Sequence, residues 1–197
     1  MDKLINAGKE FLEERQDKDK REEKQSFGGG GGGGGFFDRD DEDDFRTARD
    51  EASRRAGSSG GSDMFSSIIS AIGQKKSTLA NDDIDEEDAI RKHKKSYVDD
   101  DDDEADEKSL GTAAAMQALK LFNQGEAGGK QGKGALLGLA MAEASKLFDN
   151  KAAKGKVSSG TSKESVIQDA GEMAMKMYLK SQGQQQGGIL GLASKFM

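Results

Sequence analysis

Residues 138–149 read Gly-Leu-Ala-Met-Ala-Glu-Ala-Ser-Lys-Leu-Phe-Asp, and this stretch decides the fold. Apolar residues recur through it and just before it at i, i+3, i+4, i+7, i+10 and i+11, which is the spacing of one helix face. The pattern predicts a helix with a broad apolar stripe, and its many small side chains allow a neighbouring helix to approach closely. The six positions are Leu137, Ala140, Met141, Ala144, Leu147 and Phe148.

Two other segments, which begin at Ala113 and Gln168, align with this one. Repeats of this length indicate helical units that bury their faces against one another. We therefore predict an all-α fold, a small Ala/Gly/Met-rich helical bundle with three related helices, over residues 105–197. The matching positions are Lys120, Lys146 and Lys176; Leu121, Leu147 and Met177; and Phe122, Phe148 and Tyr178.

Capping signals give approximate ends for the helices. A capping box that starts at Thr161 opens the third repeat helix, and Gly125 ends the first. Upstream, residues 63–72 have apolar side chains at helical spacing and predict a short helix. A second capping box at Asp83 predicts a helix over 84–97.

The rest of the chain is poor in apolar residues. Leu, Ile, Val and Phe make up 33 of 197 residues, about 17%, and a value below about 20% points toward disorder. Residues 1–108 carry a net charge of −12 and residues 109–197 one of +5. We expect a long disordered acidic, Gly-rich N-terminal region before the bundle. Its predicted parts are a charged amphipathic helix over 1–25, a Gly-rich acidic linker over 26–62, and short helices with an acidic run over 63–104. Within the linker, a short helix is an open alternative, because apolar residues recur at Phe45, Ala48, Ala52 and Ala56.

The N-terminal helix has one narrow apolar stripe formed by Leu4, Ile5, Phe11 and Leu12. An amphipathic segment of this kind can lie on a membrane surface or against a partner. The alternative is a charged, partly helical tail, because isolated helices are marginal in water. These four residues are the candidate membrane- or partner-binding residues.

Several classes of chemistry are disfavoured by the composition. The chain has no Cys and one His, which excludes thiolate zinc sites, cysteine catalysis and multi-histidine metal sites. Residues 128–134 resemble a phosphate-binding loop but lack its first Gly and its final Ser or Thr. The acidic run over 99–104 lacks the alternating ligands and central Gly of a calcium-binding loop. We expect no enzyme activity, catalytic residue, cofactor or metal site.

A basic cluster surrounds the single histidine, His93, which we expect to be exposed on the surface. Such a cluster can contact phosphate or an acidic partner. The acidic run over 99–104 follows directly, so neutralisation within the chain is the preferred interpretation. The net charge of −7 argues against nucleic-acid binding. The basic residues are Arg91, Lys92, Lys94 and Lys95.

Blocks of the sequence from residue 63 onward resemble an uncharacterised fungal protein family that carries a C-terminal helical domain of unknown function. The resemblance implies a small, soluble helical protein with no established activity, and it brings no catalytic residues. The blocks that carry it are Asp83–Ile90 followed by Tyr97, Ser109–Lys120, Gly138–Asp149, Lys176–Tyr178 and Gly191–Phe196.

Together these features predict a non-enzymatic helical interaction or stress-related protein. A peripheral membrane or partner-docking protein is the alternative. It would use its terminal amphipathic segments, which are the stripe over residues 4–12 and the short apolar segment that begins at Ile189. The expected partners are another protein or a second copy of the chain, with weak membrane-surface contact as a further option. Neither nucleic acid nor a small-molecule substrate is expected. With no signal peptide and no membrane-spanning run, the expected location is the cytoplasm, with the nucleus left open.

Overall fold

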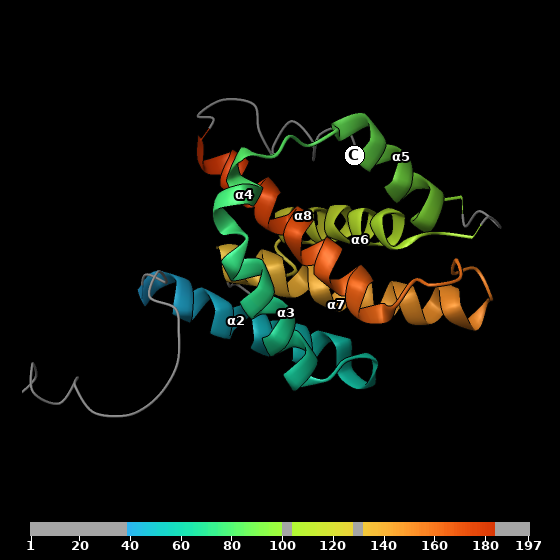
Figure 1. The fold of residues 1–197 in the computed structure, drawn as a ribbon, viewed down its shortest axis with the longest axis horizontal. Helices are drawn as coiled ribbons and strands as arrows, with labels where there is room; N and C mark the ends of the chain where they lie inside the picture. The colour runs from blue at the N-terminus through green and yellow to red at the C-terminus, as the bar shows by residue number, and fades with distance from the viewer. Residues whose placement is uncertain (1–38, 100–103, 128–131, 184–197) are drawn as a thin grey trace, which may run out of the picture. The chain divides into compact units, whose positions relative to one another are not determined.

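The computed structural model describes residues 39–99, 104–127 and 132–183, and these form an all-α bundle (Figure 1). Strands are absent from these residues, where Ala105 and Val157 form one isolated parallel bridge. The predicted fold class is confirmed. The elements are α2 (Arg39–Ala56), the short 3-10 helix η1 (Gly57–Ser59), α3 (Ser62–Gln74), α4 (Lys76–Asn81), α5 (Glu86–Tyr97), α6 (Glu107–Asn123), α7 (Lys133–Ala153) and α8 (Lys163–Gly183).

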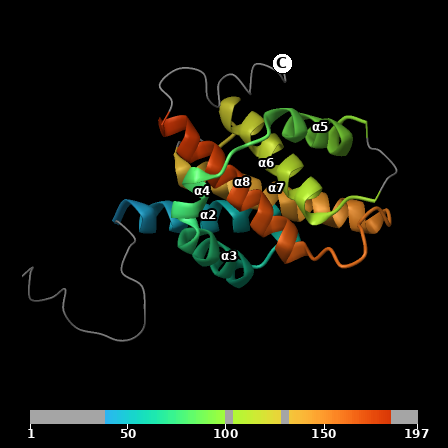
Figure 2. The same cartoon turned by 45° about the horizontal axis from the view of Figure 1, so that its top comes forward.

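Helix α7 is the centre of the bundle and contacts α2, α6 and α8. Every residue from Lys133 to Ala142 is buried, as expected for a helix that is apolar on all sides. Its leucines each contribute roughly 1.5–3 kcal/mol of stability by their burial. Both views place α2 and α3 on one side, α6, α7 and α8 in the middle, and α5 on the opposite side (Figures 1 and 2). The three repeat helices thus pack on one another as predicted.

Glycines let α2 and α7 approach closely. A Cβ on Gly138 would lie 2.6 Å from the backbone oxygen of Ala48, and one on Gly134 would collide with the backbone of Asp44. The facing residues of α2 are equally small, because Ala48, Ala52 and Ala56 are all buried. Close backbone contact therefore replaces large side chains in this half of the core.

The connections that follow α6 and α7 leave their helices through glycine. Gly125 follows α6 with a φ of 79° and Gly155 follows α7 with a φ of 67°, in the left-handed region that glycine adopts without strain. After each, the next residue donates its backbone N–H five residues back, from Glu126 to Leu121 and from Lys156 to Lys151. This is the Schellman arrangement, and it confirms Gly125 as the end of the first repeat helix.

The predicted domain boundaries differ from the structure. Residues 39–56, which the sequence assigns to a linker over 26–62, form α2 and contribute buried residues to the core. Helix α3 packs on α2 and α8, and α5 packs on α6, so the helices within residues 63–97 also belong to the bundle. The bundle is therefore not confined to 105–197. The composition of α2 hides this, because its buried face is made of alanines that only become a core next to the glycines of α7.

Other predictions fall outside the described residues. They concern the helix over 1–25 with Leu4, Ile5, Phe11 and Leu12, the linker up to residue 38, and the short apolar segment over 189–196.

Candidate functional site

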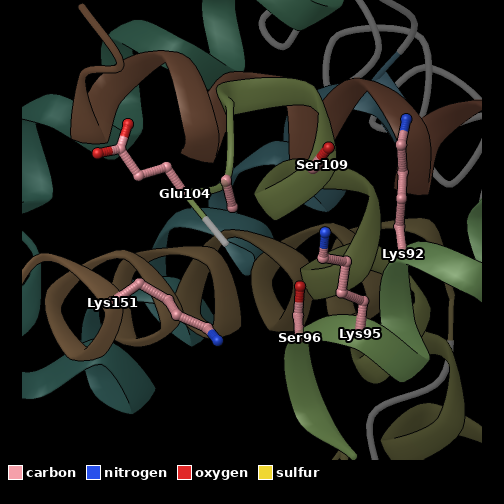
Figure 3. A pocket seen from close by; sticks show the side chains of 7 residues that line it. Lys92, Lys95, Ser96, Glu104, Ser109 and Lys151 are labelled. Atoms are coloured by element: carbon pink, nitrogen blue, oxygen red, sulfur yellow. The ribbon is translucent and has the colours of Figure 1, made fainter. Parts of the chain in front are cut away.

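A pocket with several lysines lies where α5, the start of α6 and the end of α7 meet (Figure 3). Its volume is about 60 Å³. One water molecule needs roughly 10–15 Å³ of such space, so the pocket has room for a few waters or one small polyatomic ion. The lining residues are Lys92, Lys95, Ser96, Glu104, Ala105, Ser109 and Lys151.

Helix α5 supplies one wall of this lysine pocket. Asp85 caps the helix by accepting a hydrogen bond from the backbone N–H of Asp88 at 2.9 Å. Lys92, Lys95 and Ser96 are then spaced i, i+3 and i+4, which brings them to one helix face. In Figure 3, Lys95 and Ser96 rise from α5 toward the segment that carries Ser109.

The opposite wall comes from the end of α7 and the start of α6. Lys151 lies in the last turn of α7 and reaches toward α5 (Figure 3). The Ala105 N–H donates to the Lys156 carbonyl at 3.1 Å, and the Ser158 N–H donates to the Ala105 carbonyl at 3.1 Å. These two bonds hold the segment before α6 against the segment after α7, and so keep Ser109 and Lys151 around the same space.

The charged residues that line the pocket are three lysines and one glutamate. Lys151 is only 3% exposed, and a buried ammonium is costly unless negative or polar groups compensate it. Lys92 pairs with Asp88 at 2.7 Å. The positive charge of Lys92 also acts on Asp106, the N-cap of α6. Hydrogen bonds from Ser109 hold the pKa of Asp106 below its usual value, and the charge of Lys92 lowers that pKa further. Three lysines from two helices therefore line one small cavity.

A second, more open pocket of about 320 Å³ adjoins the first and shares Ser96 with it. The hydroxyl of Tyr97 is buried on this side and has no hydrogen-bond partner among the described residues. Burial, and then the nearby Glu143, raise the pKa of Tyr97 above its ordinary value. The second pocket lies between α5 and α7, and we call it the groove. The second pocket is lined by Ser96, Tyr97, Glu143, Lys146, Leu147, Asn150 and Lys154.

His93 holds α5 against α6. Its Nε2 lies 2.9 Å from the Gln117 side-chain oxygen, and its ring stacks on Tyr97 with centroids 5.1 Å apart. Burial lowers the pKa of His93, with a smaller contribution from Lys120. The prediction of an exposed His93 is wrong, since the residue is 5% exposed. The flanking charges suggested solvent, but a helix turns its residues to different sides and places His93 beneath them.

A buried ion-pair cluster joins the starts of α2 and α7. Asp41 is 4% exposed and pairs with Lys133, and also with Lys76 at 2.7 Å. Burial alone would raise the pKa of Asp41, but hydrogen bonds from Lys133 and Lys76 outweigh it and hold that pKa below its usual value. Lys133 also lies 3.2 Å from Asp44. Each charge is matched within the cluster, so it functions as an anchor between elements.

Glu51 forms a second anchor of this kind. It is 1% exposed and accepts hydrogen bonds from Arg54 and Arg55. Burial would raise the pKa of Glu51, but the two arginines hold it below its ordinary value. Arg55 also donates to the backbone carbonyl of Glu126, which follows α6. This anchor therefore ties α2 to a distant part of the chain.

Asp169 on α8 is an acidic residue that packs against α6. It is half-buried, and one of its carboxylate oxygens has no hydrogen-bond partner among the described residues. Burial, and then Glu107 and Glu172, raise the pKa of Asp169. Its Cβ faces Gly111 on α6, so close packing of the two helices explains the burial.

The structure brings only part of the predicted basic cluster into one place. Lys92 and Lys95 line the pocket, whereas Arg91 pairs with Asp88 and Lys94 is exposed. The predicted neutralisation by residues 99–104 rests mostly on residues 100–103, which are outside the described part of the chain. Lys151 and Ser109 were not singled out by the sequence, because only the fold places them beside α5.

No group of three or more His, Asp or Glu side chains within 39–99, 104–127 and 132–183 is arranged to hold a metal ion. In the same part of the chain, every helix is too short or too polar to cross a bilayer.

Comparison with known proteins finds one family. A family model described as "Domain of unknown function (DUF7721)" matches residues 44–127, from within α2 to just past α6. No curated protein and no solved structure matches the chain. The matched segment lies in the middle of the chain rather than at its C-terminal end, and it includes the α5 wall of the lysine pocket but not Lys151. The chain is thus similar, across α2 to α6, to an uncharacterised domain family.

Proposed function

We propose that this chain is a non-enzymatic interaction protein whose helical bundle binds an acidic partner at the lysine pocket. The observation that supports this is the meeting of Lys92, Lys95 and Lys151 from two helices around one cavity. Cations gathered on a concave surface focus the electrostatic potential and attract groups of opposite charge. A cytoplasmic, stress-related role is part of the proposal as the sequence suggests it.

The groove adds two further lysines, of which Lys146 pairs with Glu143 at 3.3 Å. Lys146 and Lys154 line the adjoining pocket, where Glu143 is the one carboxylate. An extended acidic segment has room along the groove, with one anionic group in the smaller pocket. A protein partner is therefore the preferred ligand class.

The test is binding of a fluorescent oligoglutamate peptide to the full chain, followed by anisotropy. Lys95→Gln removes a pocket lysine, and Lys94→Gln removes an equally exposed lysine that lies outside the pocket on the same helix. We expect saturable binding that weakens with salt and is reduced severalfold by Lys95→Gln alone. Equal loss in both variants would show attraction to α5 in general, and would refute a role for the pocket.

The alternative proposal is a peripheral membrane protein, and it rests on the apolar stripe of Leu4, Ile5, Phe11 and Leu12. Co-sedimentation of the full chain with anionic and neutral vesicles tests it. Binding that is abolished by Leu4→Asp together with Phe11→Asp, and unchanged by Lys95→Gln, would favour the membrane role over the pocket.

A further inference from the structure

A cleft of about 520 Å³ lies between α3 and α8, which pack on one another (Figures 1 and 2). It shares no lining residue with the lysine pocket. We propose that this α3–α8 cleft is the docking site for a basic amphipathic helix of a partner protein. The residues of the cleft that carry the argument are Asp63, Met64, Ser67, Ile68, Ala71 and Glu164.

Helix α3 supplies an apolar wall of the cleft. Met64, Ile68 and Ala71 are spaced i, i+4 and i+7, so they lie along one helix face. Ile68 is 6% exposed, whereas Met64 and Ala71 are partly open to solvent. Methionine is flexible and adapts its shape to different apolar partners. An amphipathic helix presents apolar residues at the same spacing, so about two turns of it can pack along this wall.

The charged residues of the cleft are two carboxylates without a cation. Asp63 lies in the first turn of α3 and Glu164 in the first turn of α8, and both are exposed. Within the described part of the chain, neither side chain forms an ion pair or a hydrogen bond. Further along the same two helices, Lys75 pairs with Glu172 at 2.7 Å. The helix pair therefore supplies a cation at that position and none at the cleft.

An apolar wall with carboxylates beside it is complementary to a helix that is apolar on one side and basic at the edges of that side. The same carboxylates disfavour other occupants. A second copy bound through the same face would bring the carboxylates of both copies together. An anionic membrane surface or a nucleic acid would be repelled. A basic protein segment is therefore the occupant that the charges favour.

The experiment is a titration of the full chain with a fluorescent model peptide in which leucine and lysine form an amphipathic helix, followed by anisotropy. The control ligand has the same leucines with glutamate in place of lysine. We expect saturable binding of the Leu/Lys peptide that weakens as salt is added, and binding of the Leu/Glu peptide that is about tenfold weaker or more. No saturable binding of the Leu/Lys peptide, or equal binding of the two peptides, would overturn the proposal.

Two exposed serines of α3 provide matched variants that locate the binding. The Ser67 hydroxyl donates to the Asp63 carbonyl at 3.1 Å and the Ser70 hydroxyl donates to the Ser66 carbonyl at 3.0 Å, but only Ser67 lines the cleft. Ser67→Tyr should fill the cleft and weaken binding about fivefold or more, whereas Ser70→Tyr should change it less than about twofold. Equal effects of the two substitutions would show that the peptide binds elsewhere on this acidic chain, and would overturn the proposal.

A charge variant supports the test if Ser67→Tyr does not fold, as its thermal melt by circular dichroism would show. Glu164 and Glu87 are both exposed and lie in the first turn of their helices, but only Glu164 lines the cleft. Glu164→Gln should weaken binding of the Leu/Lys peptide about twofold to fivefold, and Glu87→Gln should leave it unchanged. Equal effects of these two substitutions would contradict a role for the cleft carboxylates.

Sedimentation of the full chain checks for a second copy as the occupant. If the chain self-associates, and Ser67→Tyr but not Ser70→Tyr makes it monomeric while the Leu/Lys peptide does not bind, the occupant is another copy and the proposal is wrong. A monomeric chain that binds the peptide through the cleft would support a basic helix of a different protein.

Discussion

At Gly138, α7 approaches α2 so closely that a single methyl group has no space. A Cβ there would lie 2.6 Å from the Ala48 oxygen and 2.7 Å from the Glu51 Cβ. We predict that Gly138→Ala lowers the free energy of unfolding by about 1–3 kcal/mol, although alanine is the better helix former by roughly 1 kcal/mol. Urea denaturation measures this difference.

Gly61 provides the matched control for that substitution. A Cβ on Gly61 meets nothing within 4 Å, and its φ of −101° suits any residue. Gly61→Ala should therefore change stability by less than about 1 kcal/mol, most of it from its place at the start of α3. A Gly138→Ala variant as stable as the unmodified protein would show that α2 and α7 are not in backbone contact.

Lys133 is a second residue where a small change has a large expected effect. Lys133→Met removes one partner of the buried Asp41, while Lys76 remains 2.7 Å away. We predict a loss of about 1–3 kcal/mol at neutral pH, less than for a fully orphaned buried charge. Lys146→Met on the same helix removes an exposed pair and should cost under about 0.5 kcal/mol. Urea denaturation of both variants and of the unmodified protein measures these differences in the free energy of unfolding.

The pKa of Asp41 gives this prediction a pH dependence. Because the folded pKa lies below the ordinary value of 3.8, Asp41 contributes stability above that value, and the contribution is lost as the pH falls through the lowered folded pKa. The difference between the unmodified protein and Lys133→Met should therefore shrink in strong acid. A difference that stays constant down to pH 2 would argue against an ion pair.

At the scale of a helix, α5 is the element most dependent on one titratable side chain. The folded pKa of His93 is lowered from 6.5, so the neutral ring is favoured in the folded state. Stability is therefore full above about pH 6.5 and falls as the pH drops from there through the folded pKa. We predict that hydrogen exchange of the α5 amides accelerates relative to α7 between pH 7 and pH 5.

His93→Phe keeps a ring on Tyr97 and cannot be protonated, so it should remove this acid sensitivity of α5. His93 is the single histidine of the chain, which makes the assignment direct. If the α5 amides of the variant respond to acid as they do in the unmodified protein, carboxyl groups such as Asp88 must cause the change.

At the scale of the whole molecule, we expect α2 to be required for cooperative folding of the bundle. Helix α2 covers one side of α7, and its removal would expose the glycine-containing face that meets Ala48 and Ala52. We predict that residues 105–197 alone lose the cooperative thermal transition in circular dichroism, whereas residues 37–197 retain it. A fragment 105–197 that melts cooperatively at the temperature of the full chain would contradict the place of α2 in the core.

The helix ends show how far local reasoning reaches. Helix α3 begins and ends within two residues of the predicted segment over 63–72. Helix α5 begins at Glu86 with Asp85 as its cap, two residues later than predicted, because Asp85 finds the N–H of Asp88 three residues on. At α8, Ser162 accepts from the Ser165 N–H at 3.1 Å, one residue past the predicted cap. A run of Asp, Ser and Thr offers several equivalent caps, and the sequence alone does not rank them.

The existence, type and approximate ends of α3, α5 and the three repeat helices were determined by the sequence itself, whereas α2 lies in the predicted linker and α4 was not predicted. These features depend on contacts between residues three or four positions apart, and on side chains that bond to their own backbone. The all-α class followed from the three aligned segments for the same reason. The sequence also predicted that Gly125 ends α6, because the left-handed backbone conformation after a helix is a local feature that glycine adopts readily.

Only the tertiary structure decided that α2 belongs to the core, that His93 is buried, and that Lys151 lies beside Lys95. Each of these depends on which distant residues meet, and no local spacing encodes that meeting. The alanines of α2 form part of the core because glycines of α7 lie opposite them. Lys95 and Lys151 are 56 positions apart in the sequence, and they line one pocket because the fold brings α5 close to the end of α7. Burial and site geometry are properties of the packed helices, whereas helix formation is largely a property of each segment.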